Sequence, residues 1–208
     1  NVSMEIHTNM NPTVQAQLES IQAGTAGIDF PDDLYELGSV VINNQTGEIV
    51  GIMGGRNWAS GGSMLLDHAT EQFNQPGSTI KPVLDYALAF EDLGWATSHT
   101  VLDKPVTYGN WTFNNLDKTN WGVVDLPKAV GLSLNTVAIN TLQAVIDKSG
   151  VQRVTNYLTS LGFSQFKPEL FDISFAIGGG NMRVSAKELA AATGVLINGG
   201  NYIKPHTI

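Results

Sequence analysis

The sequence predicts an α+β fold in which a β-hairpin precedes a mainly helical region. The first observation is a pair of β-rich runs, Ser39–Ile42 and Glu48–Met53, joined by a polar turn that ends at Gly47. The second is a series of segments with apolar residues at helical spacing, most of them in the second half of the chain. The third is the length of the chain. It has no cysteine and so no disulfides, but 208 residues are enough to bury a hydrophobic core without them.

Before the hairpin, the sequence predicts a short strand and then a helix. Residues Val2–Thr8 alternate apolar and polar side chains, which favours a strand. Asn11 followed by Pro12 is typical of a helix start, because asparagine caps the first turn and proline fits the first helical position. The apolar positions that follow predict a helix that continues to Gly24.

The stretch Gly24–Leu37 has no period and is the best candidate for a boundary. We therefore divide the chain into an N-terminal connecting strand, helix and loop, residues 1–37, and a domain, residues 38–208. The two strands of the hairpin are too apolar to leave an edge exposed, so we expect the sheet to contain more strands than these two.

The rest of the chain is predicted to be mainly helical. The expected helices are Ser78–Leu93 with Pro82 in its first turn, Asp125–Gly131, Asn135–Lys148, Val151–Leu161, and one that opens with the capping box Ser185–Glu188 and runs to Gly199. Between them, Trp95–Trp121 shows no clear period and is interpreted as a long irregular excursion.

Composition excludes several classes of function. The net charge of −8 argues against nucleic acid as a partner, because a phosphate backbone needs clustered Lys and Arg. The absence of cysteine excludes thiolate nucleophiles and iron–sulfur clusters, and the four histidines show no metal spacing, so we expect no cofactor and no metal. No apolar run is long enough to span a membrane, and because the first residue is Asn, we expect a piece of a longer polypeptide.

Ser78 and Lys81 form the first candidate pair for chemistry. They lie at i and i+3 at an inferred helix start, so their side chains share one face and can meet. A neutral lysine amine can take the proton of a serine hydroxyl, and the helix start turns backbone N–H groups toward the group under attack. The alternative is that Ser78 only caps the helix and Lys81 is solvated.

Ser133 and Asn135 form the second candidate pair. Residues at i and i+2 point apart on a helix, but these two lie at a junction between two predicted helices, where both can reach one pocket. Ser133 could relay a proton and Asn135 could hold a substrate amide. The alternative is another helix N-cap.

Taken together, these residues resemble a known family. The strings Gln75-Pro-Gly-Ser-Thr-Ile-Lys-Pro82 and Gly131-Leu-Ser-Leu-Asn-Thr-Val-Ala-Ile-Asn140 are similar to two motifs of the penicillin-binding protein transpeptidase domain, most similar to the bifunctional class A type. Two further stretches, Ala176–Gly180 and Glu188–Ala192, also resemble the sequence of this domain. The resemblance implies a penicillin-binding/serine β-lactamase-like fold, an antiparallel sheet plus a helical region, present here without its C-terminal strands.

The resemblance also implies a function, a peptidoglycan DD-transpeptidase at the extracytoplasmic face of the bacterial membrane, in a parent anchored by an N-terminal helix. The partners would be a stem peptide ending in D-Ala-D-Ala, β-lactam antibiotics, and the rest of the parent chain. The expected catalytic residues are Ser78, Lys81, Ser133 and Asn135, and the expected substrate contacts are Thr79, Gly178, Gly179 and Trp111.

Three points remain open at this stage. No Lys-Thr-Gly motif occurs in the sequence, and we expect it on a strand beyond Ile208. Trp111, Phe113 and Trp121 could wall a substrate cleft, although packing that anchors the loop is favoured, and Gly178–Gly180 could be only a tight turn. The competing functions are a penicillin sensor, a DD-carboxypeptidase, or a non-enzymatic cell-wall binding module.

Overall fold

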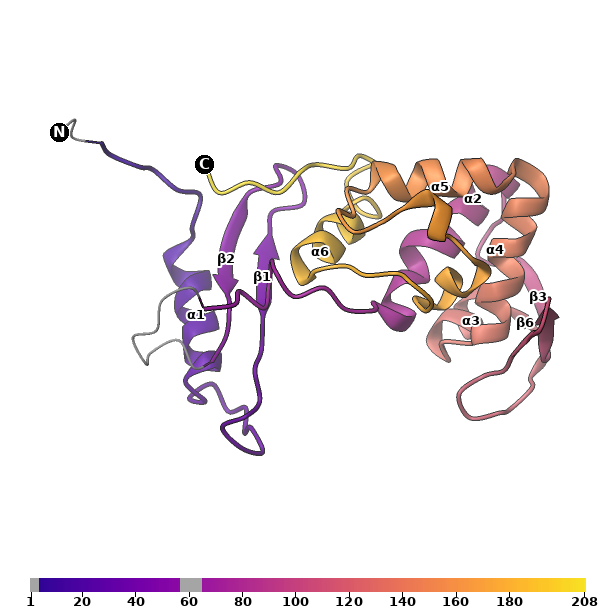
Figure 1. Cartoon of the computed structure of the whole chain (residues 1–208), viewed down its shortest axis with the longest axis horizontal. Helices are drawn as coiled ribbons and strands as arrows, with labels where there is room; N and C mark the ends of the chain where they lie inside the picture. Colours follow the sequence, from indigo (N-terminus) through magenta and orange to yellow (C-terminus); the bar gives the residue numbers. More distant parts are fainter. Residues whose placement is uncertain (1–3, 57–64) are drawn as a thin grey trace. The chain divides into compact units, whose positions relative to one another are not determined.

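The structure is a computed structural model that describes residues 4–56 and 65–208 (Figure 1). It divides into two compact units, one made of Asn1–Phe73 with Val184–Ile208 and the other of Asn74–Arg183. We call these the first and the second unit. Among the described residues, no helix combines the length and the apolar character that crossing a membrane requires.

The first unit contains a hairpin with helices against it. Its elements are α1 (Pro12–Gln22), β1 (Ser39–Ile42), β2 (Ile49–Met53) and α6 (Ala186–Gly194). The two strands pair antiparallel with Val40 opposite Ile52, and Figure 1 shows α1 lying beside them. Helix α1 packs on β2, and α6 packs on β1.

Local sequence signals explain most of the first unit. The side chain of Asn11 caps α1 by accepting from the backbone N–H groups of Thr13, at 3.0 Å, and Val14, at 3.2 Å. Gly47 ends the hairpin turn with a φ of 81°, which favours glycine. The capping box at Ser185 forms as predicted, but α6 ends at Gly194 rather than Gly199.

One expectation about strands in the first unit was wrong. Residues 4–8, the described part of the strand predicted at Val2–Thr8, form no strand, because alternation makes a strand only where a neighbouring strand can pair with it. The hairpin is ordered, and its β2 side meets the C-terminal segment of this same chain. There the N–H of Ile49 donates to the carbonyl of His206 at 2.8 Å.

The second unit is built around one central helix. Its helical elements are η2 (Gly77–Ile80), η3 (Pro82–Tyr86), α2 (Ala87–Leu93), α3 (Leu126–Gly131), α4 (Asn135–Ser149), α5 (Val151–Ser160), η4 (Pro168–Leu170) and η5 (Ile173–Ile177). Helix α4 packs against η3, α2, α5 and η5. Its apolar face is fully buried at Val137, Ile139 and Leu142, so α4 is the core of the unit.

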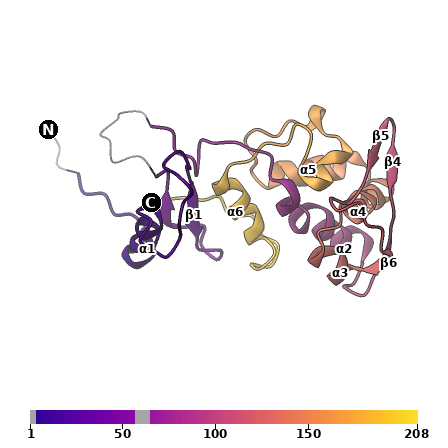
Figure 2. The same cartoon turned by 90° about the horizontal axis from the view of Figure 1, so that it is seen from below.

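The predicted irregular excursion of the second unit contains strands, so that expectation was wrong. Strand β3 (Thr100–Asp103) pairs antiparallel with β6 (Gly122–Asp125), and β4 (Val106–Tyr108) pairs antiparallel with β5 (Trp111–Phe113). Figure 2 shows the β4–β5 hairpin beside α4. Strands of three or four residues are too short to display a period of two, which explains why the sequence pattern concealed them.

The segment expected to form one helix at Ser78–Leu93 instead consists of a 3₁₀ turn, a π-helical turn and a regular α-helix. Pro82 has no N–H to donate to the carbonyl of Ser78, which instead accepts from the N–H of Lys81 at 3.3 Å in the 3₁₀ turn η2. The next turn widens, and the carbonyl of Lys81 accepts from the N–H groups of both Asp85 and Tyr86. Regular α-helix begins only at Ala87.

Candidate active site

Ser78 lies on an exposed turn that a close backbone contact holds in place. A Cβ atom added at Gly178 would lie 2.2 Å from the carbonyl oxygen of Gly77, so only glycine allows the end of η5 to approach the turn this closely. The N–H of Gly77 also donates to the carbonyl of Gly178 at 3.3 Å. Gly178 therefore supports the turn that presents the Ser78 hydroxyl.

Lys81 connects this turn to the segment that contains Ser133 and Asn135. Its Nζ donates to the carbonyl oxygen of Ser133 at 2.7 Å, to the Oγ of Ser133 at 3.2 Å, and to the Oδ1 of Asn135 at 2.7 Å. The side chain is only 3% exposed. The structure thus brings together residues that are 52 and 54 positions apart in the sequence.

The surroundings of Lys81 increase the fraction of its amine that is neutral. Burial lowers the pKa of the Lys81 amine from 10.5 to about 8, and the negative charge of Asp85 opposes this shift. A pKa of about 8 leaves a substantial neutral fraction near neutral pH. The amine is therefore suited to accept a proton, which the sequence argument required of it.

Asp85 is a buried acid that sequence reasoning missed. It lies one turn after Lys81 and is fully buried, and neither carboxylate oxygen has a hydrogen-bond partner within the described chain. Burial raises the pKa of the Asp85 carboxyl well above its usual value, while the charge of Lys81 opposes the rise. In sequence, an acid at this position is indistinguishable from a solvated residue on a helix.

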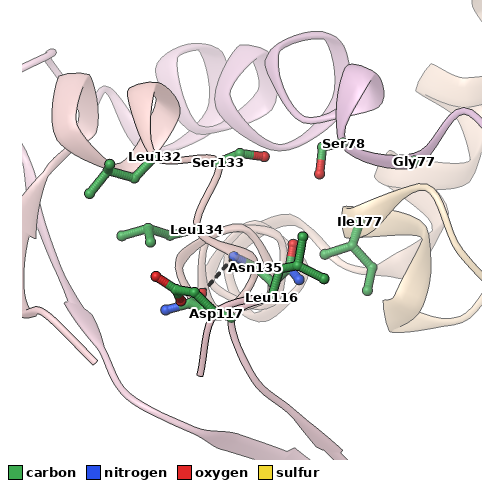
Figure 3. A pocket seen from close by; sticks show the side chains of 10 residues that line it. Gly77, Ser78, Leu116, Asp117, Leu132, Ser133, Leu134, Asn135 and Ile177 are labelled. Atoms are coloured by element: carbon green, nitrogen blue, oxygen red, sulfur yellow. Dashed lines mark hydrogen bonds between the residues drawn. The ribbon is translucent and has the colours of Figure 1, made fainter. Parts of the chain in front are cut away.

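Ser133 has a backbone conformation that directs it into the site. Its φ is 53°, in the left-handed region that residues other than glycine rarely adopt. This conformation lies in the turn between α3 and α4. Figure 3 shows the Ser133 hydroxyl pointing toward Ser78 across the top of the pocket. Strain of this kind persists where the surrounding contacts impose it, and the bond from Lys81 to the Ser133 carbonyl is one such contact.

The start of α4 is held by a buried polar network that the sequence did not reveal. Leu134 is at the N-cap position of α4, and its side chain has no polar group that could cap the helix. Asn115, from another segment, caps α4 instead. The Oδ1 of Asn115 accepts from the N–H groups of Asn135, at 2.9 Å, and Thr136, at 3.3 Å. Its Nδ2 donates to Asp103 at 2.8 Å, and Asp103 in turn accepts from the Thr136 hydroxyl. This network holds the backbone at Asn135, where α4 begins.

These elements enclose a pocket of about 450 Å³. Its lining residues are Gly77, Ser78, Asn115, Leu116, Asp117, Leu132, Ser133, Leu134, Asn135 and Ile177. Figure 3 shows Ser78, Ser133 and Asn135 around this space, and Lys81 bonds to the last two. Three of the four expected catalytic residues therefore line one pocket, and the fourth, Lys81, bonds to two of them.

The expected substrate contacts are placed differently from the catalytic residues. Thr79 is exposed, and its hydroxyl donates to the carbonyl of Pro76 at 2.5 Å. Gly178 is buried against the turn of Ser78. Gly179 and Trp111 line a second cavity, which is considered below. Across residues 4–56 and 65–208, no group of three or more His, Asp or Glu side chains is arranged to hold a metal ion.

The chain matches a known family along most of its length. The penicillin-binding protein transpeptidase domain profile matches residues 37–208, so the chain belongs to the penicillin-binding protein transpeptidase family. It is 30% identical over 208 residues to penicillin-binding protein 1A/1B of Bacillus subtilis, covering 99% of this chain and 22% of that protein. It is 31% identical to penicillin-binding protein 1A of Streptococcus oralis, covering 97% and 32%. The relatives are class A proteins, as the sequence motifs predicted.

Solved structures confirm the predicted α+β fold. Penicillin-binding protein 1A from Haemophilus influenzae superposes with a TM-score of 0.70 at 28% identity, over 83% of this chain and 25% of that one. PonA1 from Mycobacterium tuberculosis, in complex with penicillin V, gives a TM-score of 0.77 at 23% identity, over 98% and 54%. This chain therefore covers only part of the length of the proteins it resembles.

Proposed function

We propose that the protein is a peptidoglycan DD-transpeptidase in which Ser78 forms an acyl-enzyme with the penultimate D-Ala of a stem peptide and releases the terminal D-alanine. The observation that supports this most is the set of bonds from Lys81 to Ser133 and Asn135, because it joins a poised base to the pocket that contains the Ser78 hydroxyl. The family match supports the same class of reaction.

The contacts of Lys81 suggest how protons move. A neutral amine keeps two N–H donors and gains one lone pair. The carbonyl of Ser133 and the Oδ1 of Asn135, both at 2.7 Å, can only accept, so they retain the two donors. The lone pair is then free to take the proton of Ser78 as its Oγ attacks the substrate carbonyl.

In this proposal, Ser133 returns that proton. Its hydroxyl lies 3.2 Å from the Lys81 amine and can either accept or donate. It can therefore pass a proton from Lys81 to the nitrogen of the departing D-alanine. An amine of a peptide on a neighbouring peptidoglycan strand then attacks the Ser78 ester. The new amide bond forms, the ester bond to Ser78 breaks, and Ser78 regains its proton. The amide of Asn135 orients the peptide beside these groups.

β-Lactams would acylate the same serine, and the solved relative PonA1 in complex with penicillin V supports this expectation. The same proposal includes two features of the whole protein. One is a strand with the Lys-Thr-Gly motif, and the other is a membrane anchor that positions the site at the extracytoplasmic face.

The test is labelling of the complete gene product with a fluorescent penicillin, followed by mass spectrometry of the adduct. We expect one adduct on Ser78, no adduct in Ser78→Ala, and normal labelling of Ser160→Ala. Ser160 is a matched control because it is exposed on α5 and its hydroxyl donates only to the carbonyl of Tyr157. A folded wild-type protein without an adduct would favour a cell-wall binding module. An adduct without transfer to an amine would favour a sensor or a carboxypeptidase.

A further inference from the structure

A second cavity adjoins the nucleophile pocket in the second unit. It measures about 660 Å³ and is lined by Gln75, Trp111, Phe113, Asp172, Ile173, Ser174, Ile177, Gly179, Gly180 and Asn181. Ile177 lines both spaces, so the two are adjacent. We call this space the side cavity. The mechanism described above uses none of its polar groups.

Its rim is tied to the segment that leads to Ser78. The Nε2 of Gln75, three residues before Ser78, donates to the carbonyl of Gly180 at 2.7 Å. Gly180 has a φ of 59°, which favours glycine, and a Cβ atom added there would lie 2.6 Å from the Oγ of Ser174 and 2.9 Å from the Oδ2 of Asp172. The cavity is therefore a formed feature beside the reacting serine.

The residues that line the side cavity suit a ligand with a positively charged group on a partly apolar side chain. Trp111 is 74% exposed, which leaves its ring available to a ligand. Asp172 is the only ionisable residue in the lining. Its Oδ1 accepts from the N–H and the hydroxyl of Ser174, and its Oδ2 lies beside Gly180. The nearby Arg183 is not in the lining, and it donates to the carbonyls of Gly180 and Met182.

An aromatic face and a carboxylate are the two groups that attract an ammonium ion. Transpeptidation needs two peptides, and the nucleophile pocket of about 450 Å³ accounts for the one that becomes the acyl group. The other must bring a primary amine to the Ser78 ester from a neighbouring site. The side cavity has the charge, the aromatic surface and the position for that peptide.

We propose that the side cavity binds the amine-bearing side chain of the acceptor peptide, with its ammonium group held at the Trp111 ring and the Asp172 carboxylate. This inference rests on the proposed transpeptidase function. The ammonium gives one proton to water before the amine attacks. The amine nitrogen then forms a bond to the ester carbonyl carbon, the bond from that carbon to Ser78 Oγ breaks, and the second proton passes to Ser78 Oγ.

The experiment measures how the acyl-enzyme partitions between transfer and hydrolysis. The complete gene product is given a D-alanyl thioester donor and two acceptors, Nα-acetyl-lysine amide and hydroxylamine, which is small and uncharged at neutral pH. Asp172→Asn and Trp111→Ala are compared with Glu169→Gln and Phe90→Ala, which replace two exposed residues outside the lining. Asparagine caps η5 as well as aspartate does, so the first variant keeps the fold.

We expect the ratio of transfer to hydrolysis with the lysine amide to fall about two- to fivefold in Asp172→Asn and about fivefold in Trp111→Ala. The ratio with hydroxylamine, and both ratios in the control variants, should stay within experimental error of the wild type. Added salt should reduce the effect of Asp172→Asn.

Three results would overturn the proposal. One is an unchanged ratio with the lysine amide, and another is an equal loss with hydroxylamine. The third is a change confined to the KM of the donor, which would assign the cavity to the acylating peptide. Failure of the proposed function is distinguishable, because the wild-type protein would then form no acyl-enzyme at all.

Discussion

The replacement of Lys81 by arginine tests whether this residue is a base or only a positive charge. The pKa of about 8, rather than 10.5, leaves about a tenth of the amines neutral at pH 7 instead of about 0.03%, a gain of roughly 300-fold. A guanidinium group has a pKa above about 12 and keeps less than about one part in 10⁵ neutral. Lys81→Arg therefore retains the charge and removes the function of a base.

We expect Lys81→Arg to acylate with penicillin at least about 100-fold more slowly than the wild type, and no faster than Lys81→Ala, because general base catalysis contributes about 10²- to 10⁴-fold. The wild-type rate should rise about tenfold per pH unit up to pH 8 and level off above it, since only the neutral amine reacts. Rapid mixing with a fluorescent penicillin across this pH range measures both effects.

Lys148→Arg is the matched control, because Lys148 is exposed in the last turn of α4 and its replacement should leave the rate unchanged. If Lys81→Arg retained a tenth or more of the wild-type rate, Lys81 would be only an electrostatic contact. A wild-type rate that did not depend on pH below 8 would lead to the same conclusion.

Three further predictions follow from buried contacts, each checked by thermal unfolding. Gly178→Ala should lower both Tm and the acylation rate, because its methyl group would clash with the backbone of Gly77; an unchanged Tm would show that the turn adapts. Asn115→Ala should destabilise the fold by about 2–4 kcal/mol, since it leaves Asp103 and the start of α4 without partners, whereas a cost below about 1 kcal/mol would contradict the network. The stability of Asp85→Asn relative to the wild type should increase as pH rises from 4 to 8. Because the pKa of Asp85 is raised in the folded state, the folded protein keeps a proton that the unfolded chain releases, and the wild type loses stability over this range. A stability difference that did not depend on pH would refute this.

The sequence predicted those features that depend on neighbouring residues. The cap at Asn11, the turn at Gly47 and the capping box at Ser185 all appear in the structure, because each needs only residues within four positions. The motif spacing and the family resemblance also predicted that Ser78 and Asn135 meet at one site, and in the structure both residues line the same pocket.

Features that depend on distant partners could not be predicted. Asp103 and Asn115 lie in a segment without a period, and only the approach of the start of α4 makes them a network. Pro82 was expected to fit an ordinary first turn. Its missing N–H instead changes the hydrogen bonding on both sides of Lys81, and this effect requires the three-dimensional path of the chain.

The Asn115 network also bears on how the site fluctuates. The N–H of Trp121, just before β6, donates to Asp103 at 2.7 Å, so the same carboxylate holds the β3–β6 strand pair and the start of α4. A local opening that separates these strands would therefore release Asn115 and, with it, the backbone N–H of Asn135 at the start of α4. The strand pair and the start of α4 at Asn135 thus belong to one cooperative opening unit, in which protection of the β6 amides against hydrogen exchange reports how often the pocket is assembled.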